Sequence, residues 1–230
     1  MKNSKILLVA TMLFAFASVA FAGSITVGNA DTGNCYPFMC NDTGVTSGQS
    51  IDYQQVYTST AFSGVTNITS LTFTNALFGG NLIAGNYEIF LGYTAAPVNG
   101  LSTNLPSNVI SESLFADFTA DGTTSGGFTV NGNFTYDPGL GNLLLEVIAT
   151  DQANVPNGSG NGYNDADDTG SVTSRAYCLT GLGCVADSVG LVTTFGTGNA
   201  PPPIPEPGSL VLLGTGLLGA AGALRRKFNV

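Results

Sequence analysis

Positively charged residues are confined almost entirely to the two ends of this 230-residue chain. Lys2 and Lys5 open the chain, Arg225, Arg226 and Lys227 close it, and Arg175 alone lies between them. Residues 23–198 therefore hold fourteen acidic residues against one basic residue. With so few charges, a body of this length must cover its core with neutral hydroxyl and amide groups, which is typical of extracellular all-β proteins.

The composition excludes several classes of function. The chain has no His, and residues 23–198 contain no Lys, so a Ser-His-Asp triad, an imidazole metal site, a Schiff base and a P-loop lysine are all excluded from the body. The strongly negative charge repels phosphate backbones, and we expect no nucleic-acid partner. Catalysis by the body would have to use carboxylates, Tyr, Ser, Thr or a bound metal.

The first 22 residues have the three parts of a secretory signal peptide. Lys2 and Lys5 form the positive start, residues 6–16 are apolar, and Ala20 and Ala22 give the small-x-small pattern that signal peptidase accepts. Cleavage after Ala22 would leave Gly23 as the first mature residue. The alternative is a buried N-terminal helix.

The C-terminal end also has three parts in a fixed order. Residues 199–207 are rich in proline and favour an extended polyproline geometry. Residues 208–224 carry no charge, and as a helix they would span roughly 25 Å, enough to cross a bilayer core. Residues 225–230 begin with three basic residues, which prefer the cytoplasmic side. Together, the two ends predict an exported body held by a C-terminal transmembrane helix.

This C-terminal pattern resembles the PEP-CTERM sorting tail of bacteria with two membranes. The resemblance rests on Pro205, Glu206 and Pro207, the uncharged span after them, and Arg225, Arg226 and Lys227. It implies recognition by exosortase, a membrane-embedded cysteine protease or transpeptidase, with cleavage near the Pro-Glu-Pro triplet. It also implies transfer to the cell surface or the exopolysaccharide matrix. The alternative is a plain membrane anchor that is never cleaved.

Residues 23–198 show strand signals and no convincing amphipathic helix. Large residues alternate along residues 51–57 and 87–93, and residues 143–150 are apolar on both faces, as in a central strand. Asn131-Gly132 within residues 128–136 predicts a type I′ hairpin. Short strands separated by Gly, Asn and Asp predict an all-β, antiparallel β-sandwich, jelly-roll-like, with a β-helix as the alternative.

The four cysteines pair by proximity in the sequence. Export makes disulfides the default, and we expect Cys35–Cys40 and Cys178–Cys184. Crossed pairs are the alternative. The spacings of four and five residues do not suit a zinc site.

Residues 161–170 form the most acidic stretch and the only candidate metal site. Asp165, Asp167 and Thr169 followed by Gly170 match the first half of a calcium-binding loop, with Thr in place of the third Asp, and Asp168 is a further possible ligand. The twelfth position is Ala176 where such a loop needs a bidentate Glu. The alternatives are a weak calcium site and a solvated polar loop. We expect no cofactor, with calcium as the alternative.

Two glutamates are candidates for a carboxylate pair. Glu146 lies in the apolar segment 143–150, where burial would raise its pKa, and Glu112 is one of only two other glutamates in the body. A buried structural role for Glu146 is the simpler interpretation. Gln54–Tyr57 and Thr173–Arg175 weakly resemble anonymous domains that often precede such tails, and this resemblance implies no activity.

These observations predict an exported, exosortase-sorted protein of the cell surface or extracellular matrix, transiently anchored in the inner membrane. We expect a non-enzymatic body, with signal peptidase, exosortase, the membrane and exopolysaccharide as partners. The alternatives are a carbohydrate-binding or calcium-dependent adhesion module, and a polysaccharide-cleaving enzyme that uses carboxylates.

Overall fold

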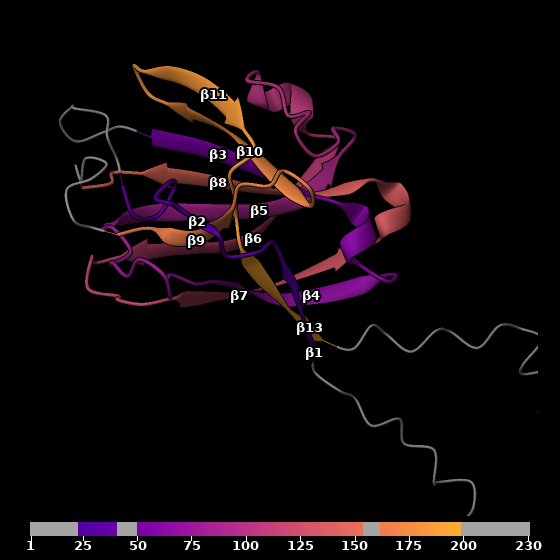
Figure 1. Ribbon diagram of the computed structural model, residues 1–230, viewed down its shortest axis with the longest axis horizontal. Helices are drawn as coiled ribbons and strands as arrows, with labels where there is room; N and C mark the ends of the chain where they lie inside the picture. Colours follow the sequence, from indigo (N-terminus) through magenta and orange to yellow (C-terminus); the bar gives the residue numbers. More distant parts are fainter. Residues whose placement is uncertain (1–22, 41–49, 154–161, 199–230) are drawn as a thin grey trace, which may run out of the picture. The chain divides into compact units, whose positions relative to one another are not determined.

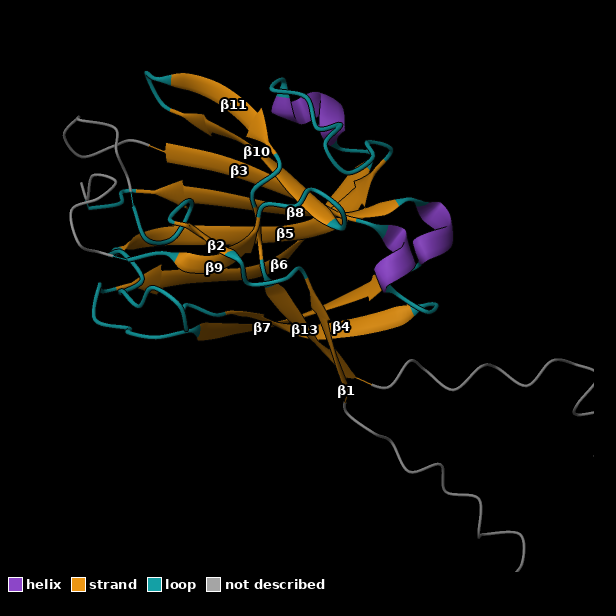
Figure 2. Ribbon diagram, in the orientation of Figure 1, coloured by secondary structure: helices purple, strands orange, loops and turns teal. Residues whose placement is uncertain are grey.

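The computed structural model describes residues 23–40, 50–153 and 162–198. All of its regular elements are strands or short 3-10 turns, and Figure 2 shows no long helix in the described ranges. The strands are β1 (Gly23–Val27), β2 (Thr32–Asn34), β3 (Ser50–Tyr57), β4 (Thr66–Phe73), β5 (Gly85–Thr94), β6 (Ser111–Ala120), β7 (Phe128–Tyr136), β8 (Asn142–Thr150), β9 (Asn164–Asp167), β10 (Thr173–Leu179), β11 (Gly183–Asp187), β12 (Gly190–Leu191) and β13 (Thr193–Gly198). The 3-10 turns are η1 (Ser59–Ala61), η2 (Leu105–Asn108) and η3 (Pro138–Leu140).

The described residues form three antiparallel sheets (Figure 1). The four-stranded sheet has the order β1-β13-β4-β7, the six-stranded sheet β11-β10-β3-β8-β5-β6, and the small sheet β12-β9-β2. Among the eight strands β1, β3–β8 and β13, the first pairs with the last, the second with the seventh, the third with the sixth, and the fourth with the fifth. That is the pairing order of a jelly roll. The body is all-β and antiparallel, as predicted, and the parallel ladders of a β-helix are not found in the described residues.

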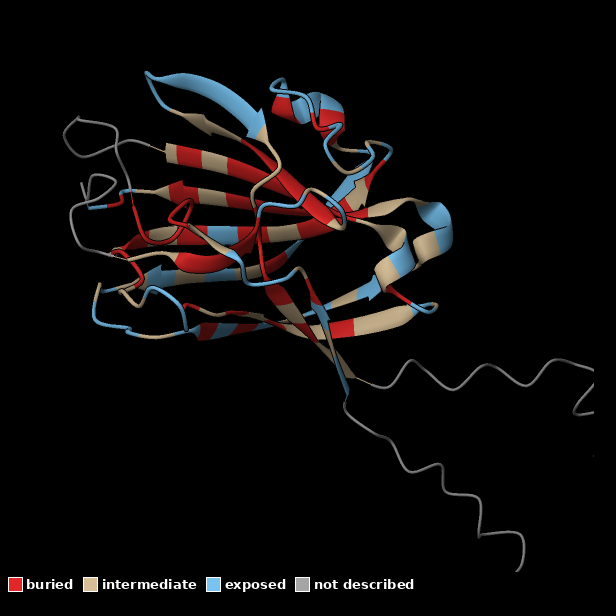
Figure 3. Ribbon diagram, viewed as in Figure 1, coloured by how far each residue is buried: buried red, intermediate tan, exposed pale blue. Residues whose placement is uncertain are grey.

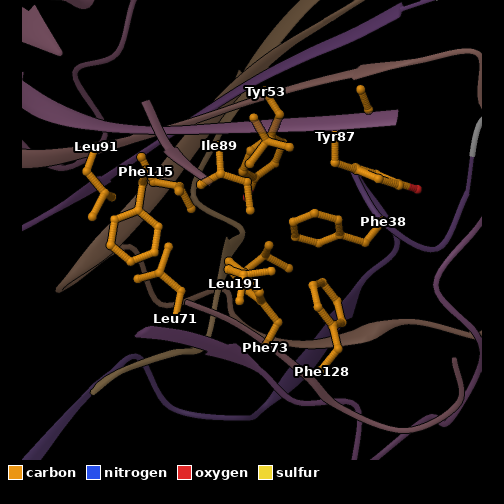
Figure 4. Close-up of a cluster of buried hydrophobic side chains, with 14 of the residues drawn as sticks. Phe38, Tyr53, Leu71, Phe73, Tyr87, Ile89, Leu91, Phe115, Phe128 and Leu191 are labelled. Carbon is orange, nitrogen blue, oxygen red and sulfur yellow. The ribbon is translucent and has the colours of Figure 1, made fainter. Parts of the chain in front are cut away.

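The large sheets pack face to face over one apolar core, as in a β-sandwich. Leu71 and Phe73 on β4 and Phe128 on β7 face Ile89 and Leu91 on β5 (Figure 4). Burial follows the two-residue period along these strands, because alternate side chains point to opposite faces of a sheet. Figure 3 shows the resulting bands of buried and exposed residues.

β8 confirms the expectation of a central strand. It lies between β3 and β5, and Leu143 to Val147 are all buried. Its inner face enters the sandwich core, while Leu144 on the outer face packs with Val56, Leu101, Leu105 and Ala176 in a second apolar cluster. Residues 95–110, including η2, therefore cover part of the outer face.

The predicted hairpin at Asn131-Gly132 is wrong. Residues 128–136 form one continuous strand, β7, paired with β4. The register skips a residue here, because Ile68 pairs with Phe134 while Ser70 pairs with Asn131, so β7 carries one extra residue. Gly132 allows β7 to lie close to the edge strand β6, because a Cβ placed on it would lie 2.3 Å from the Phe115 carbonyl oxygen.

This contact predicts the effect of a single methyl group. Gly132→Ala should lower the free energy of unfolding by about 1–3 kcal/mol, because the new methyl overlaps the backbone and ring of Phe115. Gly64→Ala is the matched control, since a Cβ there meets nothing within 4 Å and the stability should stay equal or rise slightly. Urea unfolding followed by circular dichroism measures both. Equal stability of the two variants would contradict the packing described.

Candidate functional site

Three acidic side chains come together on the outer face of the six-stranded sheet. We call Asp52 on β3, Glu146 on β8 and Glu112 on β6 the carboxyl cluster. Glu146 lies opposite Gln54 on one side and Phe90 on the other, and Glu112 lies opposite Gly92. Gly92 has no side chain to separate them: a Cβ on it would come within 2.7 Å of the Glu112 Cβ.

Glu146 is the buried centre of the cluster, with 7% of its surface exposed. Its Oε1 accepts a hydrogen bond of 2.6 Å from Gln54 Nε2, and Gln54 Oε1 accepts one of 2.8 Å from Asn108 Nδ2. Asn108 also holds together residues 95–110, the segment that covers this face. Its Oδ1 accepts from the Ser102 N–H and its Nδ2 donates to the Ser102 carbonyl, both at 2.8 Å. The amide chain Asn108–Gln54 thus connects residues 95–110 to the carboxylate on β8.

Burial and mutual repulsion hold protons on the cluster. Burial, followed by the charge and hydrogen bond of Glu146, raises the pKa of Asp52 to about 7. Burial also raises the pKa of Glu112 to about 7, together with its hydrogen bond to Glu146 and the charges of Glu146 and Asp52. Below pH 7 both groups can therefore donate to Glu146.

The spacing within the cluster limits its chemistry. Hydrogen bonding and charge couple the side chains of Asp52 and Glu112 to Glu146. Retaining glycosidases separate their two carboxyl groups by about 5–5.5 Å, and inverting ones by about 6.5–9.5 Å. Within the described ranges, no group of three His, Cys, Asp or Glu side chains is arranged so that it could hold a metal ion. This holds for the carboxyl cluster too. Its geometry suits proton sharing.

The acidic stretch divides into a buried part and an exposed part, because Asp168 and Thr169 are exposed and belong to no strand. Asn164–Asp167 forms β9, all four of whose residues are buried, between β12 and β2. The two oxygens of Asp165 accept from the backbone N–H groups of Ala76 and Leu77, both at 3.0 Å. Because amide donors satisfy the carboxylate, burial of the charge is tolerated.

The other members of the predicted calcium site also have partners within the chain. Asp167 accepts from the backbone N–H of Asn29 at 3.0 Å, and from the backbone and hydroxyl groups of Thr169 at 2.8 and 2.5 Å. Asp168 is exposed, and its backbone N–H donates to Asp31. To coordinate Ca²⁺, Asp165 and Asp167 would have to exchange these donors for the ion.

Both disulfides connect cysteines that are neighbours in the sequence, as expected. Cys35–Cys40 is buried and closes the turn that carries Phe38 into the core. Cys178–Cys184 joins β10 to β11, where the two residues are register partners. Crossed pairing is excluded by these bonds.

Arg175, the one basic residue in the body, is buried and forms an ion pair with the partly exposed Asp187. Its Nε and Nη2 donate to the two oxygens of Asp187 at 2.8 and 2.9 Å, and its Nη1 donates to Asn34. Its guanidinium also lies 4.8 Å from the centre of the Tyr177 ring. Hydrogen bonds with Asp187 raise the pKa of Arg175 against the opposing effect of burial. The contact with Asn34 ties β2 of the small sheet to the six-stranded sheet.

The two segments that weakly resemble other domains are neighbouring strands. Gln55 on β3 is the register partner of Arg175 on β10. Gln55 donates to Thr173 and to the Leu191 carbonyl, both at 2.8 Å, and accepts from Tyr53 at 2.6 Å. These polar side chains are occupied in joining strands.

The predicted sorting and processing residues lie outside the described residues: Ala20, Ala22, Pro205, Glu206, Pro207, Arg225, Arg226 and Lys227. Gly23, the predicted first mature residue, begins β1. Residues 208–224, the predicted membrane helix, are likewise not described, and the described ranges contain no apolar helix of membrane-spanning length.

Comparison with known families identifies the C-terminal signal. A family model described as the PEP-CTERM protein-sorting motif matches residues 203–227, which include the Pro-Glu-Pro triplet and the three basic residues. The chain therefore carries a C-terminal PEP-CTERM sorting motif, and this motif implies export and membrane-associated sorting. No curated protein and no solved structure matches the chain.

The carboxyl cluster predicts an unusual pH dependence. In the unfolded chain both groups have a pKa near 4, so between about pH 4 and 7 the folded state binds more protons. Stability is then highest below this window and falls as the pH rises through it. Asp52→Asn keeps the hydrogen bond without the titration, and the slope of unfolding free energy against pH should fall by about half, since two groups contribute to it. Urea unfolding at pH steps from 4 to 8 measures this slope.

Glu88→Gln is the control, because Glu88 is an exposed carboxylate on β5. The control should keep the wild-type slope. A wild-type stability that rises between pH 4 and 7 would contradict the proton sharing described.

The Arg175–Asp187 ion pair gives a second prediction. Arg175→Met leaves Asp187 without its partner and should cost about 2–4 kcal/mol of unfolding free energy. The double variant Arg175→Met/Asp187→Asn should cost less, because no unpaired carboxylate remains. Thermal and urea unfolding compare the two variants. The ion-pair account fails if the double variant is the less stable one.

Proposed function

We propose that this protein is a non-enzymatic component of the cell surface or extracellular matrix, delivered by exosortase-type sorting. The observation that carries the proposal is the PEP-CTERM motif at residues 203–227, which implies export and exosortase as the processing partner. The body is then a passenger that works outside the inner membrane through binding or packing. Signal peptidase acts on residues 1–22, and residues 208–224 hold the chain in the membrane before cleavage.

The chemistry of the body supports an extracellular role. Both cysteine pairs are disulfides, the bonds expected of a chain that folds in an oxidising compartment. Its net negative charge and neutral polar surface suit solubility among hydrated polymers. Exopolysaccharide is accordingly the matrix partner that we propose.

The assignment of a non-catalytic body, without a resident cofactor, has separate support. The most reactive-looking side chains, Asp165, Asp167 and Arg175, are each satisfied by partners within the chain. The carboxyl cluster favours a second candidate, a polysaccharide-cleaving enzyme, because it brings Glu112 and Glu146 together. Its carboxyl groups are coupled to one another by hydrogen bonding, whereas glycosidases keep their two carboxyl groups apart, and we therefore prefer the binding role. A calcium-dependent adhesion module remains the alternative for residues 165–169.

Mass spectrometry of the protein recovered from its producing cells tests the sorting proposal. We expect a mature N-terminus at Gly23 and a C-terminus near the Pro-Glu-Pro triplet. Pro205→Ala/Glu206→Ala/Pro207→Ala should leave the tail through Val230 on the protein and keep it with the membrane fraction. Pro201→Ala, within the same proline-rich stretch, should be processed normally. A wild-type protein that retains Val230 would overturn cleavage of the tail.

A further inference from the structure

The two sheets leave a seam between their edge strands β6 and β7. β6 ends the six-stranded sheet and β7 ends the four-stranded one, and the two are consecutive in the chain. Each carries one extra residue: Phe115 in β6, where Ile89 pairs with Ala116 and Phe90 with Leu114, and one residue near Gly132 in β7. The strands meet at this level, where Gly132 lies against the Phe115 carbonyl.

A cavity of about 600 Å³ opens where the two strands part. It lies between residues 116–121 of β6 and its end, and residues 128–131 of β7, with Thr124 of the connecting segment. Its volume falls within the range of about 300–1,000 Å³ typical of small-molecule sites. Leu82 and Phe128 supply buried apolar surface, and Figure 4 shows Phe128 directed into the core.

Phe118 gives the cavity a flat aromatic wall. One face of its ring stacks on Tyr87, with centroids 5.2 Å apart and an interplanar angle of 16°. The half-buried ring also lines the cavity. A ring fixed in this way offers its remaining surface to the flat C–H face of another ring at little entropic cost.

The polar lining selects the charge of a ligand. Asp117 and Asp121 are exposed carboxylates, Thr124 adds a hydroxyl and Asn131 an amide, and the lining includes no cation. Hydrogen bonds from Thr123 lower the pKa of Asp121, which keeps it ionised. Arg175, the only cation in the body, is engaged by Asp187. An anionic ligand is therefore repelled, whereas hydroxyl groups find both acceptors and donors.

The same edges are poorly suited to adding a strand from another chain. A bulge and an acidic side chain on an edge strand are the devices by which proteins prevent such pairing. β6 has both, with its extra residue at Phe115 and a carboxylate at Asp117. The features of the seam favour a sugar over an extended peptide.

We propose that the cavity between β6 and β7 binds a neutral, hydroxyl-rich glycan. Phe118 stacks under a sugar ring, Asp117 and Asp121 accept hydrogen bonds from its hydroxyls, and Asn131 supplies both a donor and an acceptor. This site rests on the exopolysaccharide partner proposed above and gives that partner a place on the body, whereas the sorting function depends on the tail alone.

Calorimetry on the full chain in a sugar-free detergent tests the site. The neutral probes are oligomers of glucose, mannose and N-acetylglucosamine, the anionic probe is an oligogalacturonate, and a Thr/Val hexapeptide stands for strand addition. We expect saturable binding of at least one neutral probe and no binding of oligogalacturonate or the hexapeptide. The bound neutral probe should also slow amide hydrogen exchange at residues 116–120 and 128–131.

Variants locate the binding. Phe118→Leu keeps a large apolar side chain but loses the flat ring. Asp117→Asn/Asp121→Asn replaces two carboxylates with neutral amides that keep one acceptor oxygen each, so each variant should weaken binding by about tenfold. Glu88→Gln is the control: Glu88 is the exposed register partner of Asp117 and does not line the cavity. The double Asp variant covers the case in which Phe118→Leu fails to fold.

Several results would overturn the proposal. The first is that no neutral probe binds, and the second is that oligogalacturonate binds as tightly as a neutral probe. The third is that the hexapeptide binds instead of the neutral probes. The fourth is that both cavity variants bind the neutral probe as tightly as the wild type does. Each is independent of tail cleavage, so a failure here leaves the sorting proposal standing and a failure of sorting leaves this test intact.

Discussion

The aromatic packing around Phe38 holds the two large sheets together. Its ring lies 4.8 Å from Phe73 on β4, 4.9 Å from Phe128 on β7 and 5.7 Å from Tyr87 on β5, so one side chain contacts both sheets. Phe38 belongs to neither sheet. It sits in the short turn closed by Cys35–Cys40, and its carbonyl accepts a hydrogen bond from Ile83. The disulfide thus fixes the turn that places Phe38 in the core. Tyr87, which packs against Phe38, also stacks on Phe118 at the seam.

Much of the architecture could be predicted from alternation along the chain. Residues 51–57, 87–93 and 143–150 became β3, β5 and β8 because the two-residue period records which face of a sheet is buried. β9 escaped this logic, since Asn164–Asp167 is polar yet fully buried. The distant amides of Asn29, Ala76 and Leu77 make that burial tolerable, and no local pattern predicts those partners. Asn131-Gly132 is the opposite case, because here a local pattern is present but does not decide the structure. The dipeptide predicts a turn, yet it lies within β7, where Gly132 packs against Phe115.

The functional features divide in the same way. The sorting tail could be recognised from sequence because its parts follow one another along the chain. Glu112 and Glu146 could be named as candidates, but Asp52, Gln54 and Asn108 could not, because their meeting depends on which strands pair. The polar residues Asp52 and Gln54, alternating with the buried Ile51 and Tyr53, were the available signal. The cavity at the seam has no linear signature, since it arises where two sheets part.

The pairing of β13 bears on how the body withstands pulling. β13 ends at Gly198, shortly before the sorting motif at residues 203–227, and it is hydrogen-bonded to β1 on one side and β4 on the other. A force transmitted along the chain from that end would load two ladders in shear, with many hydrogen bonds sharing it at once. Peeling a terminal edge strand would instead break the bonds one after another. The jelly-roll order therefore attaches the body to its tail through a mechanically resistant strand.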